Sequence, residues 1–196
     1  MKQYYIPYNE NTDINYIYLL ALYDIAEYSQ EDKAFNVIQY HSANTLSQMM
    51  SKAIDSKKTI LSISKSTVNR LLNDEKYQPY FQVDKEQKII ILKNNAKEMR
   101  KFVVLSQKEV GLIKQVKENL FAKYLMFLKY YFSFTQCKGI DTTAKQFLAM
   151  SGYATTSNAY LSKLSEYNGI LVANGIVKIK KYKDDNGYER NVYRCN

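Results

Sequence analysis

The residues best suited to chemistry are cations near the end of the chain. Alternation along a strand would place Lys178 and Lys180 on one face and Lys181 and Lys183 on the other. Ammonium and guanidinium groups in this pattern suit the phosphates of a polyanion, and we expect one of the two faces to meet them. Six basic residues fall within seventeen positions: Lys178, Lys180, Lys181, Lys183, Arg190 and Arg194.

Two other segments combine hydroxyl, amide and cationic side chains at the start of a predicted helix. Residues at a helix N-terminus reach base edges in a major groove, and phosphates favour the positive end of the helix dipole. Arg70 suits guanine and Asn158 suits adenine, although a local salt bridge on the helix surface is the alternative for Arg70. The first set is Ser64, Lys65, Ser66, Thr67, Asn69 and Arg70, and the second is Thr155, Thr156, Ser157, Asn158 and Lys163.

The charge of the chain favours a polyanionic partner. The 196 residues include 28 Lys plus Arg and 19 Asp plus Glu, for a formal net charge of +9. Residues 1–50 hold 2 basic and 6 acidic groups, so the whole excess lies after residue 50. Such a surplus predicts rapid, salt-sensitive association with a polyanion, and a solvated lysine-rich surface is the alternative.

Composition also excludes several functional classes. One histidine, His41, and two cysteines, Cys137 and Cys195, rule out most zinc sites and histidine-based triads. The six glycines are too dispersed for a phosphate-binding loop. We therefore expect no catalysis, no cofactor and no metal. The cysteines are expected to be ordinary thiols of a cytoplasmic protein, and no apolar run approaches the roughly 20 residues that span a bilayer.

The hydrophobic pattern predicts one order of elements twice. Residues 1–95 hold a helix from about Asp13 to Tyr28, a strand at 35–40, helices that begin near Thr45 and Ser64, and a hairpin at 80–92. A polar linker covers 96–107. Residues 108–196 hold a long helix that ends near Phe134, two shorter helices, and a hairpin around an Asn-Gly turn. The predicted fold class is α+β, mainly α, with two tandem domains joined by the linker and the long helix.

These patterns resemble the winged helix–turn–helix family, most strongly over residues 142–194. The stretch Thr143–Leu164 resembles a helix–turn–helix with its turn at Gly152. The ending from Lys183 to Arg194 is similar to the wing of plasmid and phage replication proteins. In the first unit, Ser64–Arg70 resembles the start of a recognition helix, and the connector 55–61 before it is longer than the tight turn of the family.

The resemblance implies sequence-specific binding of double-stranded DNA, in replication initiation or its control on a plasmid or phage. Recognition helices would occupy the major groove and basic wings would clamp phosphates, with residues 108–196 as the main DNA-binding unit. A transcriptional repressor with the same chemistry is one alternative. An assembly scaffold is another, because residues 1–50 are acidic and residues 125–134 are apolar.

The first predicted helix also suggests self-association. Tyr16, Leu19 and Tyr23 lie off its main apolar stripe, so we expect them to be exposed and to form a homodimer through the first unit. Replication or transcription proteins are possible further partners.

Overall fold

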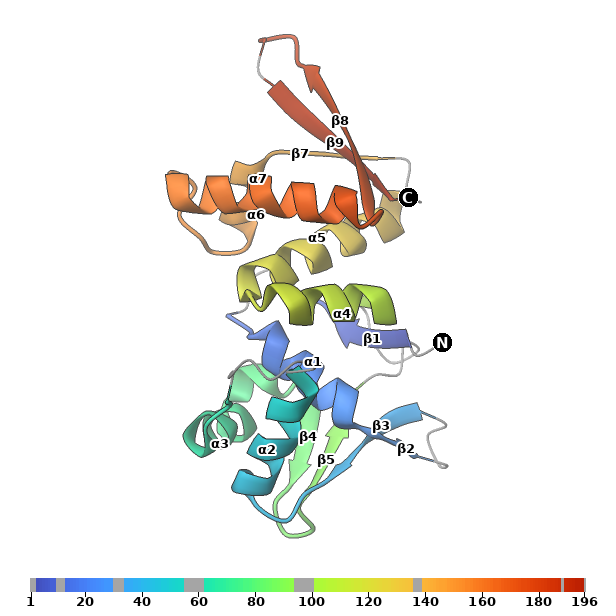
Figure 1. Ribbon diagram of the computed structural model, residues 1–196, viewed down its shortest axis with the longest axis vertical. Helices are drawn as coiled ribbons and strands as arrows, with labels where there is room; N and C mark the ends of the chain where they lie inside the picture. Colours follow the sequence, from blue (N-terminus) through green and yellow to red (C-terminus); the bar gives the residue numbers. More distant parts are fainter. Residues whose placement is uncertain are drawn as a thin grey trace. The chain divides into compact units, whose positions relative to one another are not determined.

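The computed structural model describes residues 3–9, 13–29, 34–54, 62–93, 101–135, 139–187 and 189–195 (Figure 1). These residues form an α+β structure with seven α-helices and small antiparallel sheets. The chain divides into two compact units. Unit 1 comprises residues 1–7 and 14–119, and unit 2 comprises residues 8–13 and 120–196.

Unit 1 contains four of the helices described and six strands. The helices are α1 (Tyr16–Ile25), α2 (Ala43–Ile54), α3 (Lys65–Asn73) and α4 (Gln107–Val116). The strands are β1 (Gln3–Pro7), β2 (Glu27–Ser29), β3 (Ala34–Gln39), β4 (Phe81–Asp84), β5 (Ile89–Leu92) and β6 (Phe102–Ser106). Strand β1 pairs with β6, and the other four form a sheet in the order β2-β3-β5-β4.

The helix α1 lies at the centre of unit 1. Asn15, and not Asp13, caps it, and its side chain accepts hydrogen bonds from the backbone of Ile17 and Tyr18. Tyr16, Leu19 and Tyr23 are buried, so the prediction that they are exposed is wrong. The reason is that α1 packs against α2, β3 and α4 and is therefore covered on several sides. The expected homodimer receives no support from this helix.

The single long helix expected after residue 108 is two helices. The first, α4, ends at Lys117, whose backbone is left-handed (φ 59°) and donates to the Ile113 carbonyl at 2.9 Å. The second is α5 (Asn119–Thr135). Residues 102–106, which fall within the predicted linker, form β6, and Ser106 then begins α4 with a capping box that includes Glu109. Residues 96–100 of that linker lie outside the described residues.

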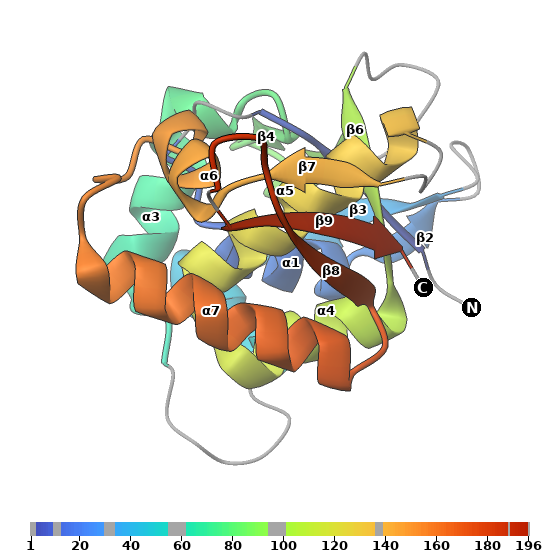
Figure 2. The same ribbon diagram turned by 90° about the horizontal axis from the view of Figure 1, so that it is seen from above.

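Unit 2 contains the rest of α5, two shorter helices and one sheet. Strand β7 (Ile140–Thr142) is followed by α6 (Ala144–Met150), α7 (Asn158–Ala173), β8 (Val177–Lys183) and β9 (Glu189–Cys195). The sheet order is β7-β9-β8, and the β8–β9 hairpin extends away from the three helices (Figure 1). From above, α7 runs along one side of this hairpin (Figure 2).

The two units share a common order of elements. In unit 1 the order is α1, β3, α2, α3, β4, β5, with β2 added between α1 and β3 and a 3-10 helix (Glu75–Tyr77) added between α3 and β4, and in unit 2 it is α5, β7, α6, α7, β8, β9. In each unit the strand that precedes the pair of helices, β3 or β7, pairs with the second strand of the hairpin. Each unit therefore has a pair of helices followed by a hairpin, as the pattern of elements predicts.

The core of unit 2 joins α5, α7 and β9. Tyr124 donates to Asn168 at 2.7 Å, and the Asn168 amide donates to the Tyr193 hydroxyl at 3.3 Å. Tyr124 and Tyr193 are buried, and Leu125, Met126 and the other described side chains of α5 up to Phe132 are buried or nearly so. The apolar segment 125–134 is thus largely core in the residues whose side chains are described.

Cys195 lies at the end of β9 and is disulfide-bonded. The expectation of an ordinary thiol is wrong for this residue. Disulfide pairing depends on how close two cysteines come in the fold, which spacing along the sequence does not give. Cys137 lies outside the described residues.

Candidate nucleic-acid interface

Two serines of α2 hold the residue that precedes α3. Ser51 Oγ accepts from the backbone N–H of Ile63 at 2.9 Å, and Ser47 Oγ donates to the Ile63 carbonyl. Ser51 also donates to the Ser47 carbonyl at 2.7 Å. The connector 55–61 lies outside the described residues. Because both backbone groups of Ile63 are bound to α2, the start of α3 is fixed against α2 independently of the length of that connector.

The structure places the first set of predicted site residues on α3. Ser64 caps the helix and accepts from the backbone N–H of Thr67 at 3.1 Å. Its hydroxyl lies 2.8 Å from that of Ser66 and 2.9 Å from that of Thr67. Thr67 is half-buried, whereas Ser64, Lys65, Ser66, Asn69 and Arg70 are exposed.

Asn73 and Lys85 extend this surface, and sequence reasoning missed both. The Asn73 amide donates to the Asn69 carbonyl at 2.6 Å, and Asn73 Oδ1 accepts from Lys85 Nζ at 2.7 Å. Lys85 lies in the turn of the β4–β5 hairpin, so this contact joins the hairpin to the end of α3. The helical spacing of Asn73 from Asn69 and Arg70 is a signal for its position on the helix, but its contact with Lys85 depends on the fold. We call the exposed surface of Lys65, Ser66, Asn69, Arg70 and Asn73 the α3 face.

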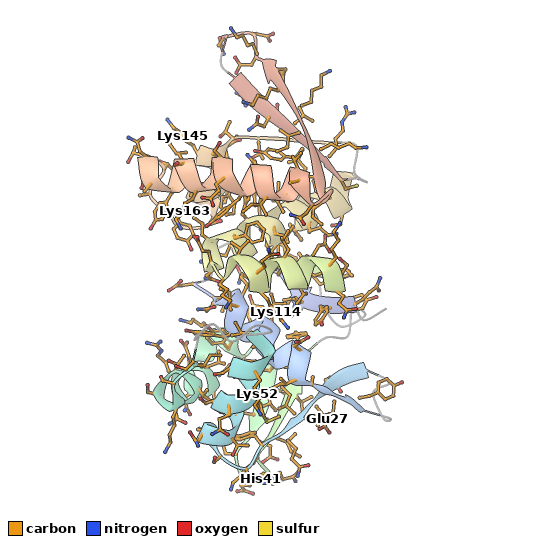
Figure 3. All side chains as sticks on the ribbon, viewed as in Figure 1. Glu27, His41, Lys52, Lys114, Lys145 and Lys163 are labelled. Carbon is orange, nitrogen blue, oxygen red and sulfur yellow. The ribbon has the colours of Figure 1, made fainter. Side chains whose placement is uncertain are left out.

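The second set of predicted residues lies around the start of α7. Ser157, and not Thr155 or Thr156, caps this helix, and its hydroxyl accepts from Tyr160 N at 3.5 Å. Thr155 is half-buried in the preceding turn, whereas Thr156 and Asn158 are exposed. Lys163 is half-buried on the side of α7 away from the β8–β9 hairpin (Figure 3). The structure therefore groups Thr156 with Asn158 and separates Lys163 from the hairpin lysines.

The exposed face of α7 consists mostly of small side chains and carries no cation. Val172 is the largest apolar side chain on it, at 47% exposed. Its single charged residue is Glu166. The exposed positions are Asn158, Ala159, Ser162, Ser165, Glu166, Gly169, Val172 and Ala173.

The register of the β8–β9 hairpin decides which cations share a face. Lys178 lies opposite Arg194, and Lys180 lies opposite Val192. We call Lys178, Lys180 and Arg194 the outer row, because they alternate with Val177 and Tyr193, which are buried. The inner row is Lys181 and Lys183, which lie opposite Asn191 and Glu189. All five cations are exposed.

The outer row places like charges side by side. Directly opposed cations destabilise a strand pair unless a counter-charge binds them. Among the described side chains, no acidic group forms an ion pair with Lys178, Lys180 or Arg194. The outer row is therefore a surface on which an anion relieves repulsion.

Arg190 has a different role from the other hairpin cations. Its Nε donates to Asp184 Oδ2 at 2.7 Å, and this hydrogen bond raises the pKa of the guanidinium. The bond closes the turn between the two strands. On the same face, the Tyr182 hydroxyl donates to Asp141 of β7, which raises the pKa of Tyr182. The Arg190 guanidinium is thus bound to an acidic side chain of the hairpin itself, unlike the cations of the outer row within the described residues.

In the part of the chain that the structure describes, no helix is both long and apolar enough to cross a bilayer. Comparisons of the chain with protein-family models, curated proteins and solved structures give no match.

Proposed function

We propose that this chain binds double-stranded DNA in a sequence-specific manner and that each unit is a winged helix. The support for the fold is the order of elements and their pairing. In each unit a pair of helices, α2–α3 or α6–α7, lies between a strand and a hairpin. The second strand of the hairpin pairs with the strand that precedes the helix pair, which is β3 or β7. In this proposal α3 and α7 are the recognition helices, and the β4–β5 and β8–β9 hairpins are the wings.

The observation that carries the proposal is the outer row. Lys178 and Arg194 are exposed and directly opposed, and Lys180 follows on the same face. A duplex offers phosphates at regular spacing, so it supplies several counter-charges to such a row at once. Each contact releases condensed counterions, which makes the affinity fall steeply as salt rises.

The two hairpins differ in charge. Residues 84–88, the end of β4 and the turn after it, contain Asp84, Lys85, Glu86 and Lys88, so their charges cancel. The β8–β9 hairpin carries six basic and three acidic residues between 178 and 194. We therefore assign phosphate binding to the β8–β9 hairpin, because it is the proposed wing with a net positive charge on these counts.

The biological setting that we propose is replication initiation, or its control, on a plasmid or phage. It depends on the resemblance of residues 142–194 to replication proteins. Repression of transcription would use the same contacts on a different operator and is the alternative. An assembly scaffold has less support, because the described residues of the apolar segment that would serve it are largely buried.

A gel-shift series tests the proposal. The full chain is titrated against a random duplex pool and against duplexes selected from that pool, each at two salt concentrations. We expect selected duplexes to bind at least tenfold more tightly than the pool, and binding to both to weaken as salt rises. Absence of duplex binding at low salt would refute the proposal.

A further inference from the structure

The exposed surfaces of α3 and α7 differ in the groups that recognise bases. The α3 face carries two cations and two carboxamides and no acid. The exposed face of α7 carries one carboxamide, Asn158, and one charge, the acidic Glu166. Carboxamides and guanidinium groups form bidentate pairs with adenine and guanine, whereas a carboxylate is repelled by the phosphates that flank the groove.

We propose a division of labour that rests on the proposed function: the α3 face of unit 1 reads the base sequence, and the outer row of unit 2 supplies affinity that does not depend on sequence. The partner that fits the α3 face is the major groove of a DNA duplex. Residues 108–196 are expected from the sequence to be the main DNA-binding unit; this assignment keeps phosphate binding there and moves the reading of bases to unit 1.

The size and chemistry of α3 fit one groove. The helix has 9 residues and is about 13 Å long, which spans about four base pairs. Arg70 reaches guanine O6 and N7 with two donors, and Asn69 pairs with adenine N6 and N7. Both side chains are exposed and lie on the side of α3 opposite the buried Val68 and Leu71. Burial of these two residues fixes the rotation of the helix, so the reading residues face outward.

Lys85 acts as a positioning residue for this face. Its ammonium donates to Asn73 Oδ1 at 2.7 Å, while the Asn73 amide donates to the Asn69 carbonyl at 2.6 Å. This chain of contacts holds the last turn of α3 against the β4–β5 hairpin. An ammonium group has three donors, so Lys85 retains donors for a phosphate beside the groove.

The test uses the full chain and a duplex selected from a random pool by the wild-type protein. Affinity for this duplex and for a scrambled duplex is measured by fluorescence anisotropy. We expect Arg70→Ala to reduce discrimination roughly tenfold, mainly at one base-pair position, with little loss of affinity for the scrambled duplex. Lys178→Gln should weaken binding to both duplexes by the same factor. Lys52→Ala, which removes an exposed lysine of α2, is the matched control and should change neither affinity.

Lys85 is tested by Lys85→Met and by the conservative Lys85→Arg. The first should relax discrimination with an unchanged melting temperature, and the second should restore it. The inference is overturned if Asn69→Ala and Arg70→Ala keep full discrimination while Asn158→Ala loses it, because unit 2 would then read the sequence. A wild-type chain that binds no duplex refutes the proposed function itself, so the two failures are distinguishable.

Discussion

The backbone N–H of Ile63 donates to Ser51 Oγ at 2.9 Å, so the residue before the N-cap of α3 is bound to α2. Ile63 is buried, so its backbone N–H would lack a hydrogen-bond acceptor if the Ser51 hydroxyl were removed. Ser51 is half-buried on α2 and does not belong to the α3 face. The orientation of α3 therefore depends on a side chain of α2 that lies outside the α3 face.

Ser51→Ala should destabilise the protein by about 1–3 kcal/mol, because it leaves a buried donor unsatisfied. The free energy of unfolding is measured by urea denaturation. Ser62→Ala is the control, since Ser62 is an exposed serine of the same segment and should change stability little. Equal stability of Ser51→Ala and the wild type would show that this hydrogen bond does not hold α3.

Asp141→Asn should raise affinity for a duplex by about two- to fivefold at low salt. Asp141 and Lys180 both lie opposite Val192, one on each side of it, so this exposed carboxylate reduces the positive potential of the outer row. Asparagine keeps an oxygen that accepts from Tyr182. Tyr182→Phe removes the hydrogen bond and keeps the charge, so it should not raise affinity. Unchanged affinity of Asp141→Asn at low salt would contradict the assignment of the outer row.

Stability should fall as the pH rises above about 10, where tyrosines of the unfolded chain lose their protons. Burial raises the pKa of Tyr23, and it raises that of Tyr124 well above its usual value. The folded chain keeps protons that the unfolded chain releases, so their contribution is complete below about pH 10 and is lost as the pH climbs further.

The measurement is tyrosinate absorbance followed together with far-ultraviolet circular dichroism during an alkaline titration. Tyr23 and Tyr124, which are buried, should ionise only as the helical signal disappears. Full ionisation of all 19 tyrosines without loss of helix would contradict the buried positions of Tyr23 and Tyr124.

Local signals in the sequence predicted much of the fold. The helix α3 begins near Ser64 as expected, and the hairpins at 81–92 and 177–195 follow from alternation around polar turns. These features depend on residues a few positions apart. The pairing of β1 with β6 joins segments about a hundred residues apart in the sequence, and no local pattern predicts it.

The same limit explains what was missed in the candidate site. The sequence pattern grouped Asn69 and Arg70 near the start of one predicted helix, but the contact of Asn73 with Lys85 spans twelve positions and needs the folded hairpin. The exposure of Tyr16, Leu19 and Tyr23 was predicted from one stripe, although α1 is enclosed by several elements. The break at Lys117 depends on one left-handed residue within an otherwise continuous amphipathic pattern.

The central claim is that the outer row binds the phosphates of a duplex. The most direct measurement is the slope of log affinity against log salt for three proteins: the wild type, Lys178→Gln with Lys180→Gln, and Lys181→Gln with Lys183→Gln. We predict that the outer-row pair reduces the slope by about two, since each lost phosphate contact removes about 0.9, and that the inner-row pair reduces it by less than half as much. An outer-row pair with the slope of the wild type would contradict the account.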